Sequence, residues 1–117
     1  MSLRYDYIMN QIEKATQLIA ALISSKKIEL GQEADINQTL SDLTGFVLDN
    51  FANEKNVATL GALLSMLDDD NKKAIAAMLL QLKDKELYGD TCQSLLNQID
   101  QKKLHAKVKR LLAMSMA

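Results

Sequence analysis

The feature that most constrains the fold of this 117-residue chain is a pair of adjacent apolar residues that recurs every sixteen positions. The pairs are Val47-Leu48, Leu63-Leu64, Leu79-Leu80, Leu95-Leu96 and Leu111-Leu112. In one continuous α-helix, successive pairs would lie about 160° apart and would face nearly opposite sides. Separate helices of about twelve residues would instead place every pair at the same point of its own core-facing side. We therefore predict a series of short helices that fold back on one another.

The composition supports an all-α fold. The chain has no proline and only four glycines, and these are the two residue types that most disfavour helix interiors. Hydrophobic residues make up 48% of the chain and aromatic residues only 4%, which predicts a core of Leu, Ile, Met and Ala. We expect residues 1–117 to form a single all-helical domain of five or six helices. Its antiparallel helical hairpins would form either a closed bundle or a short hairpin stack.

Apolar residues at helical spacing locate the expected helices. The ranges are 6–24, 35–53, 57–67 and 71–83, then a fifth helix that starts after Tyr88-Gly89 and a sixth from Leu104 onward. We expect Gly31 to separate the first two helices. We expect Gly45 to lie in the middle of the second helix, where another helix approaches closely. Because neither Gly nor Pro separates helices five and six, they could equally be one kinked helix.

Two stretches resemble known families. Tyr5 to Met9, followed by Ile12-Glu13 and Leu18 to Leu22, is similar to the first helix of a family of small, uncharacterised all-helical bacterial proteins. That resemblance implies an all-α fold and a bacterial, cytoplasmic setting, and it supplies no activity and no site residues. Leu60-Gly61 followed by Leu64 resembles the first helix of a tetratricopeptide-type repeat. The proline and the aromatic residue of that repeat are absent, so this second resemblance implies a hairpin layout only.

The first helix carries a wider apolar face than a single neighbouring helix requires. The candidate interaction face consists of Ile8, Met9, Ile12, Ile19, Leu22 and Ile23. Either two helices of the same chain pack on this face, or part of it meets another chain. On the second interpretation we expect a homodimer that forms through this face, through the apolar C-terminal end at residues 111–116, or through both, with a different protein as the other candidate partner.

The last helix carries the candidate anion-binding face. Lys103, Lys107 and Arg110 share one side of a continuous helix, because they are spaced i, i+4 and i+7. Such a face could contact the phosphates of a nucleic acid or another anionic surface. The net charge of −1 and the lack of interleaved aromatic residues argue against nucleic acid. The alternative is an ordinary solvated helix face.

We predict no catalytic residue, no metal ligand and no cofactor. The acidic run at residues 68–70 has neither the glycine nor the distal glutamate of a calcium loop, so we expect Asp69 or Asp70 to cap the next helix. Cys92 and His105 are the only residues of their types and lie in no recognised motif. We expect a buried cysteine and a surface histidine rather than a nucleophile with its base.

The remaining observations concern location and function. A single cysteine excludes an intramolecular disulfide and suits a reducing compartment. The longest apolar run is six residues, far short of the about 20 that cross a bilayer, and the N-terminus does not have the pattern of a signal peptide. We expect a cytoplasmic, non-enzymatic interaction or self-assembly module. The alternatives are an anionic-surface binder through the last helix and a small-ligand carrier with a pocket between helices.

Overall fold

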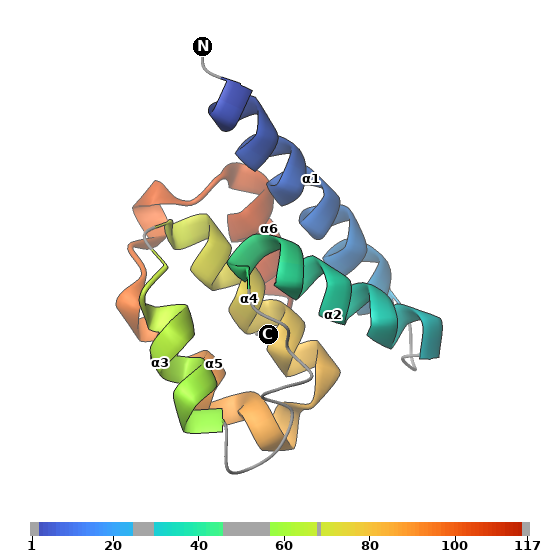
Figure 1. The fold of residues 1–117 in the computed structure, drawn as a ribbon, viewed down its shortest axis with the longest axis vertical. Helices are drawn as coiled ribbons and strands as arrows, with labels where there is room; N and C mark the ends of the chain where they lie inside the picture. Colours follow the sequence, from blue (N-terminus) through green and yellow to red (C-terminus); the bar gives the residue numbers. More distant parts are fainter. Residues whose placement is uncertain (1–2, 25–29, 46–56, 68, 116–117) are drawn as a thin grey trace.

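The computed structural model describes residues 3–24, 30–45, 57–67 and 69–115, and these residues form helices and no strands. The helices are α1 (Leu3–Ser24), α2 (Leu30–Thr44), α3 (Val57–Ser65), α4 (Asp70–Lys83), α5 (Lys85–Gln98), the 3₁₀-helix η2 (Gln101–Lys103) and α6 (Ala106–Ser115). The predicted all-α class is confirmed (Figure 1). The radius of gyration is 13.3 Å, close to the roughly 13 Å of a compact chain of this length, which favours a closed bundle over an open stack.

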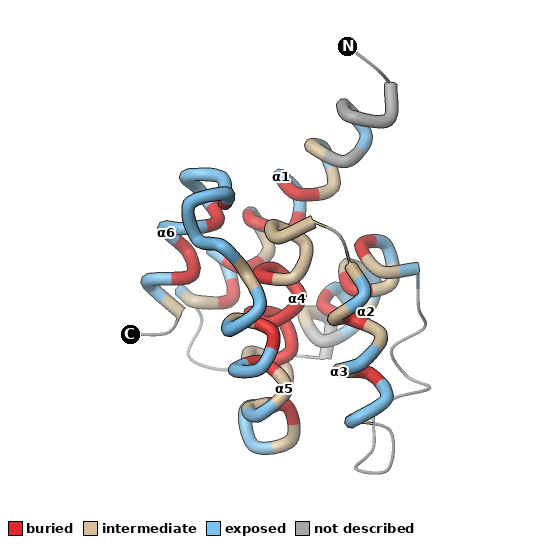
Figure 2. The backbone as a smooth tube through the Cα atoms, turned by 90° about the vertical axis from the view of Figure 1, so that its left-hand side faces the viewer, coloured by how far each residue is buried: buried red, intermediate tan, exposed pale blue. Residues whose placement is uncertain are grey.

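Helix α4 lies at the centre of the bundle, and every other helix packs against it. All seven residues from Ala74 to Leu80 are buried, so this stretch has no solvent-facing side (Figure 2). The helix is therefore buried on more sides than the single apolar face by which helical spacing located it. Alanine at positions 74, 76 and 77 explains how neighbours fit on several sides, because a methyl side chain lets helix backbones approach closely.

Helix α1 packs against three helices, namely α2, α4 and α6. Its central apolar residues Ile12, Ala15, Ile19 and Leu22 are all buried in this chain. The width of the apolar face therefore reflects the number of neighbours within the chain. This arrangement corresponds to the first interpretation of the face, with packing against further helices of the same chain.

Helix α2 begins earlier and ends earlier than predicted. It starts at Leu30, so Gly31 lies inside the helix rather than before it. It ends at Thr44, because Gly45 has a φ of +78° and its N–H donates to the carbonyl of Ser41 at 2.8 Å. A left-handed glycine directly after the last helical residue is a common helix stop. Gly45 is thus a terminator and not a mid-helix packing position, while Val47 and Leu48 lie outside the described residues.

The start of α5 was also predicted wrongly, since Tyr88 and Gly89 lie within the helix. The break is at Asp84, which has an extended backbone and separates α4 from α5 by one residue. Its N–H donates to the carbonyl of Leu80 at 3.0 Å, and its carboxylate accepts the N–H of Leu87 at 3.1 Å. One residue therefore ends one helix and caps the next.

Helices α5 and α6 are separate. Ile99 and Asp100 have extended backbones, and the short η2 helix follows them. The carboxylate of Asp100 accepts the N–H of Lys102 at 3.0 Å, which fixes this turn. The alternative of a single kinked helix is therefore wrong.

Four of the repeated apolar pairs lie among the described residues, and each has at least one buried member, as the sixteen-residue spacing predicted. Both members of Leu79-Leu80 and of Leu111-Leu112 are buried. In the pairs at positions 63 and 95, one member is buried and the other is half-buried. The half-buried residue of the second pair, Leu96, lines the groove described next.

Candidate functional site

A groove of about 480 Å³ lies between α5 and α6. The residues that line this α5–α6 groove are Gln93, Leu96, Asn97, Gln101, Lys109, Leu112 and Ala113. The groove exists because α5 and α6 both pack on α4 and make few contacts with each other. The small side chain of Ala113 leaves the space between them unfilled.

The α5–α6 groove has an apolar floor and a polar rim. Leu96 is half-buried and Leu112 is buried, so aliphatic carbon forms the floor. Three amide side chains contribute to the lining: Gln93 and Asn97 lie one helical turn apart on α5, and Gln101 lies on η2. The first two are linked, because the Nε2 of Gln93 donates to the Oδ1 of Asn97 at 3.3 Å. Each amide offers both a donor and an acceptor, which matches the two polar groups of a peptide unit.

The predicted interaction face on α1 is directed into the chain. Ile12, Ile19 and Leu22 are buried, and Met9 and Ile23 are partly buried against the same core. Ile8 lies in α1, and its side chain is outside the described residues. The residues of this face that are described pack within one chain, so they do not present a free surface to a second copy.

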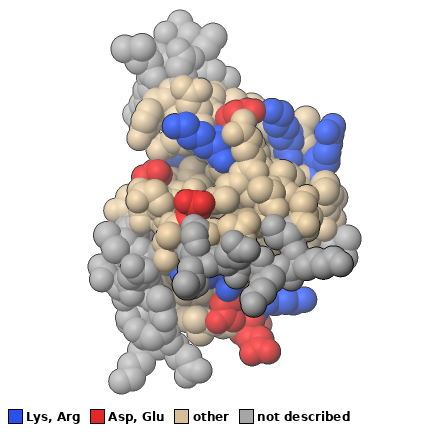
Figure 3. Space-filling view, turned by 90° about the vertical axis from the view of Figure 1, so that its right-hand side faces the viewer, with Lys and Arg blue, Asp and Glu red and all other residues tan. Residues whose placement is uncertain are grey.

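The predicted anion-binding face is not a single helix face. Lys103 lies in η2, whereas Lys107 and Arg110 lie on α6, which begins only at Ala106. The extended backbone at Leu104 interrupts the helical spacing on which the prediction depended. On the face drawn in Figure 3, basic and acidic residues are interspersed, and no patch of one sign covers its described part.

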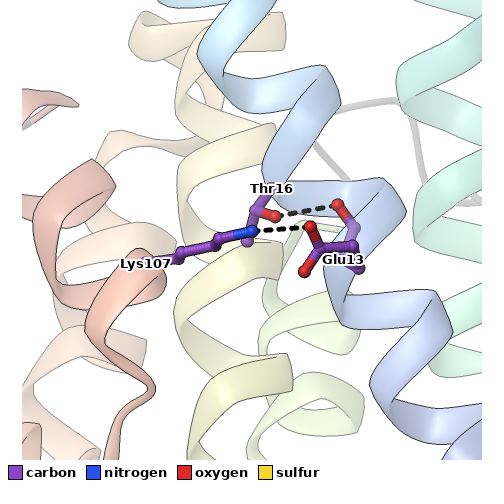
Figure 4. A network of polar contacts seen from close by, with 3 residues as sticks. All are labelled: Glu13, Thr16 and Lys107. Atoms are coloured by element: carbon purple, nitrogen blue, oxygen red, sulfur yellow. Dashed lines mark hydrogen bonds and ion pairs between the residues drawn. The ribbon is translucent and has the colours of Figure 1, made fainter.

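Lys107 instead joins α6 to α1. Its Nζ lies 2.6 Å from the Oε1 of Glu13, and the hydroxyl of Thr16 donates to the backbone carbonyl of Glu13 at 2.8 Å (Figure 4). The two charged side chains are 64% and 48% exposed, so the pair contributes at most about 1 kcal/mol. A hollow of about 220 Å³ lies beside this pair, and His105 lines it from the exposed side.

Cys92 and His105 do not form a catalytic pair. The thiol of Cys92 is buried and donates to the carbonyl of Ala77 at 3.0 Å. Burial raises the pKa of this thiol to about 12, which leaves it protonated and unreactive at neutral pH. His105 is exposed, and its backbone N–H donates to the Oδ1 of Asn71 at 2.9 Å.

The acidic run before α4 is a helix cap, as predicted. Asp69 accepts the N–H groups of Asn71 and Lys72 at 2.8 and 3.3 Å. Asp70 accepts the N–H of Asp100 at 3.5 Å, and Asp68 lies outside the described residues. In the described part of the chain, no three His, Cys, Asp or Glu side chains converge in a way that could hold a metal ion.

A second depression, of about 310 Å³, lies between α1 and α2 and is mostly polar. Gln11 crosses it, with its Nε2 donating to the backbone carbonyl of Asp42 at 3.0 Å and to the hydroxyl of Tyr7 at 3.1 Å. The amide N–H groups of Gln11 are thus already bonded within the chain, to a residue of each of the two helices.

Sequence reasoning missed the α5–α6 groove. The sequence offered one partial signal, the amides Gln93 and Asn97 at an interval of four residues, whereas Gln101 follows the break at residues 99–100. No described helix is both long enough and apolar enough to cross a membrane. Comparison of the chain with family models, with curated proteins and with solved structures found no match.

Proposed function

We propose that this chain is a non-enzymatic protein-interaction module whose binding surface is the α5–α6 groove. The observation that carries the proposal is the combination of an apolar floor, formed by Leu96 and Leu112, with a rim of side-chain amides. An enzyme would need converging nucleophiles, acids or bases, and the groove is lined instead by amides, one lysine and aliphatic groups.

The groove suits a segment of polypeptide. One leucine-sized side chain that buries about 100 Å² on the floor contributes about 2.5 kcal/mol of hydrophobic free energy. The amides of Gln93, Asn97 and Gln101 can then pair with backbone N–H and carbonyl groups of the segment. Met114, the residue after Ala113, is 52% exposed, and its flexible side chain can adapt to the partner.

Self-association is the second form of this proposal. We predicted a homodimer through α1, but Ile12, Ile19 and Leu22 of that face are buried within the chain, so the α5–α6 groove is the better supported surface for self-association. A dimer that uses the α5–α6 groove and the outer end of α6 would still serve as an assembly module. Light scattering at micromolar concentration tests it, and a strict monomer would rule it out. The resemblance of the first helix supports a bacterial, cytoplasmic setting as part of the proposal.

The test is a selection from a random-peptide display library against the wild-type protein and two variants. Ala113→Trp fills the groove with a bulky neutral side chain at an exposed position. Ala62→Trp places the same side chain at an exposed position of α3, away from the groove, and serves as the matched control. We expect peptides that bind wild type and Ala62→Trp equally and lose binding to Ala113→Trp. Equal binding to all three proteins, or no enrichment at all, would reject the proposed function.

A further inference from the structure

We infer that the α5–α6 groove takes an acidic segment of another protein that carries at least one large apolar side chain. The inference rests on the proposed function and adds the chemistry of the partner. Its basis is the distribution of charge around the groove together with the apolar floor.

The groove itself is positively charged. Among the residues that the structure describes, Lys109 is the only ionisable one in the lining, and no carboxylate of these residues lines the groove. The acidic residues nearest along the chain, Asp90 and Asp100, lie outside that lining. A partner carboxylate placed over the groove would therefore meet one ammonium group and several amide donors, and no like charge within the lining.

The stretch of chain that supplies most of the lining, from Leu96 to Ala113, is also basic overall. From Leu96 to Ser115 the chain has a single acidic residue, Asp100, and five basic ones: Lys102, Lys103, Lys107, Lys109 and Arg110. Lys107 is paired with Glu13 on α1. Among the residues that the structure describes, no carboxylate lies within ion-pair distance of the other four. All four are exposed, so they are available to a partner.

The apolar floor distinguishes a protein segment from a nucleic acid. A single-stranded nucleic acid binds through many phosphate contacts and through stacking on aromatic side chains, and none of the described residues that line this groove is aromatic. Leu96 and Leu112 would stay uncovered beneath a phosphate backbone. An aliphatic or aromatic side chain of a protein segment buries them.

The charge also argues against a second copy as the occupant. A two-fold symmetric dimer built on this groove would bring the same surface of both chains together. Such a dimer would bring together two linings that each carry Lys109 and no described carboxylate, so neither copy would supply the negative charge that complements the groove.

The experiment repeats the display selection in parallel on the wild-type protein, on Lys109→Glu/Arg110→Glu and on Lys14→Glu/Lys85→Glu. Lys14→Glu/Lys85→Glu is the matched control. It reverses two exposed charges on α1 and α5 outside the groove lining, and it has the same net charge as Lys109→Glu/Arg110→Glu. We expect the peptides selected by wild type to have a net negative charge and one or more large apolar residues. Their affinity should fall about tenfold on the groove-side variant and change little on the matched control. Raising the ionic strength from about 0.01 to about 0.15 M should weaken binding severalfold.

The outcomes separate the two levels of the proposal. Peptides that depend on the groove but are neutral or basic would overturn the acidic partner and leave the interaction function standing. If no selected peptide distinguishes wild type from Ala113→Trp, the interaction function itself is overturned. A random-sequence single-stranded DNA that binds wild type and competes with the selected peptides would replace the protein segment by a nucleic acid. A dimer seen by light scattering and lost in Ala113→Trp would replace it by a second copy.

Discussion

The three glycines at positions 45, 61 and 89 should respond to alanine in opposite directions. Gly45 has a φ of +78°, where an L-residue costs about 1–2 kcal/mol. Alanine also lowers the conformational entropy of the unfolded chain, and this effect offsets about 0.4–1 kcal/mol of that cost. We therefore expect Gly45→Ala to lower the free energy of unfolding by about 1 kcal/mol, although a Cβ at this position would meet nothing within 4 Å.

The other two glycines lie inside helices, where alanine gains about 1 kcal/mol. A Cβ on Gly61 would lie 3.4 Å from the Cγ2 of Thr91 on α5, an ordinary contact, and a Cβ on Gly89 would meet nothing within 4 Å. We expect Gly61→Ala to raise the free energy of unfolding by about 0.5–1 kcal/mol and Gly89→Ala by about 1 kcal/mol.

Urea unfolding followed by far-ultraviolet circular dichroism measures all three changes. A difference of about 1 kcal/mol corresponds to a shift of about 0.5 M in the urea midpoint, or about 4 °C in Tm. Gly45→Asn is the control, because asparagine tolerates the left-handed conformation and should lose less stability than alanine. If Gly45→Ala were neutral or stabilising, α2 would continue past residue 45, and the argument for a helix stop at Gly45 would fail.

Three further predictions concern the caps, the core and the buried thiol. Asp84→Ala should lower the free energy of unfolding by about 1 kcal/mol, because the N–H of Leu87 loses its acceptor. Asp84→Asn keeps a side-chain oxygen as acceptor and should lose less stability. An equal loss in both variants would contradict this cause. Leu64→Ala should lower the free energy of unfolding by about 2–4 kcal/mol in the same urea assay, and Leu63→Ala should lower it clearly less, because only Leu64 is fully buried. Equal losses would refute the assignment of Leu64 to the buried side of α3. Burial raises the pKa of Cys92 from 9.0 to about 12, so the folded state holds the thiol proton more tightly. The contribution of the thiol is fully present below pH 9 and is lost as the pH rises toward 12, by at most about 1.4 kcal/mol per pH unit. The stability difference between wild type and Cys92→Ala should therefore shrink or change sign between about pH 8 and about pH 11, and a constant difference would refute the shift.

Helix content and the core were predictable because both are encoded locally. An apolar residue every three or four positions forms one helical face wherever the helix lies, so Leu79 and Leu80 could be placed in a core before any neighbour was known. Asp69 was predictable as a cap for the same reason, since it bonds to N–H groups only two and three residues away.

Helix ends depend on information that a single stretch of sequence does not contain. Gly45 and Gly61 are the same residue type in similar apolar surroundings, yet one ends a helix and the other lies within one against Thr91. The break at Asp84 involves neither glycine nor proline. It occurs where α4 and α5 must pack closely on each other, and the side chain and backbone of one aspartate satisfy both helix ends.

The candidate site was harder to predict than the fold, for a physical reason that α1 and α6 show together. A wide apolar face indicates how much surface a helix must bury, but it does not indicate which chain covers that surface. Helix α1 packs the described part of its apolar face against three helices of its own chain. The α5–α6 groove arises from the opposite situation, in which two helices share the support of α4 and leave a space over Leu96 and Leu112. An apolar excess on one helix is satisfied within the bundle, because burial there brings no loss of translational freedom. A partner can bind in the space that two neighbouring helices leave unfilled. That space can be identified only from the three-dimensional arrangement of the helices.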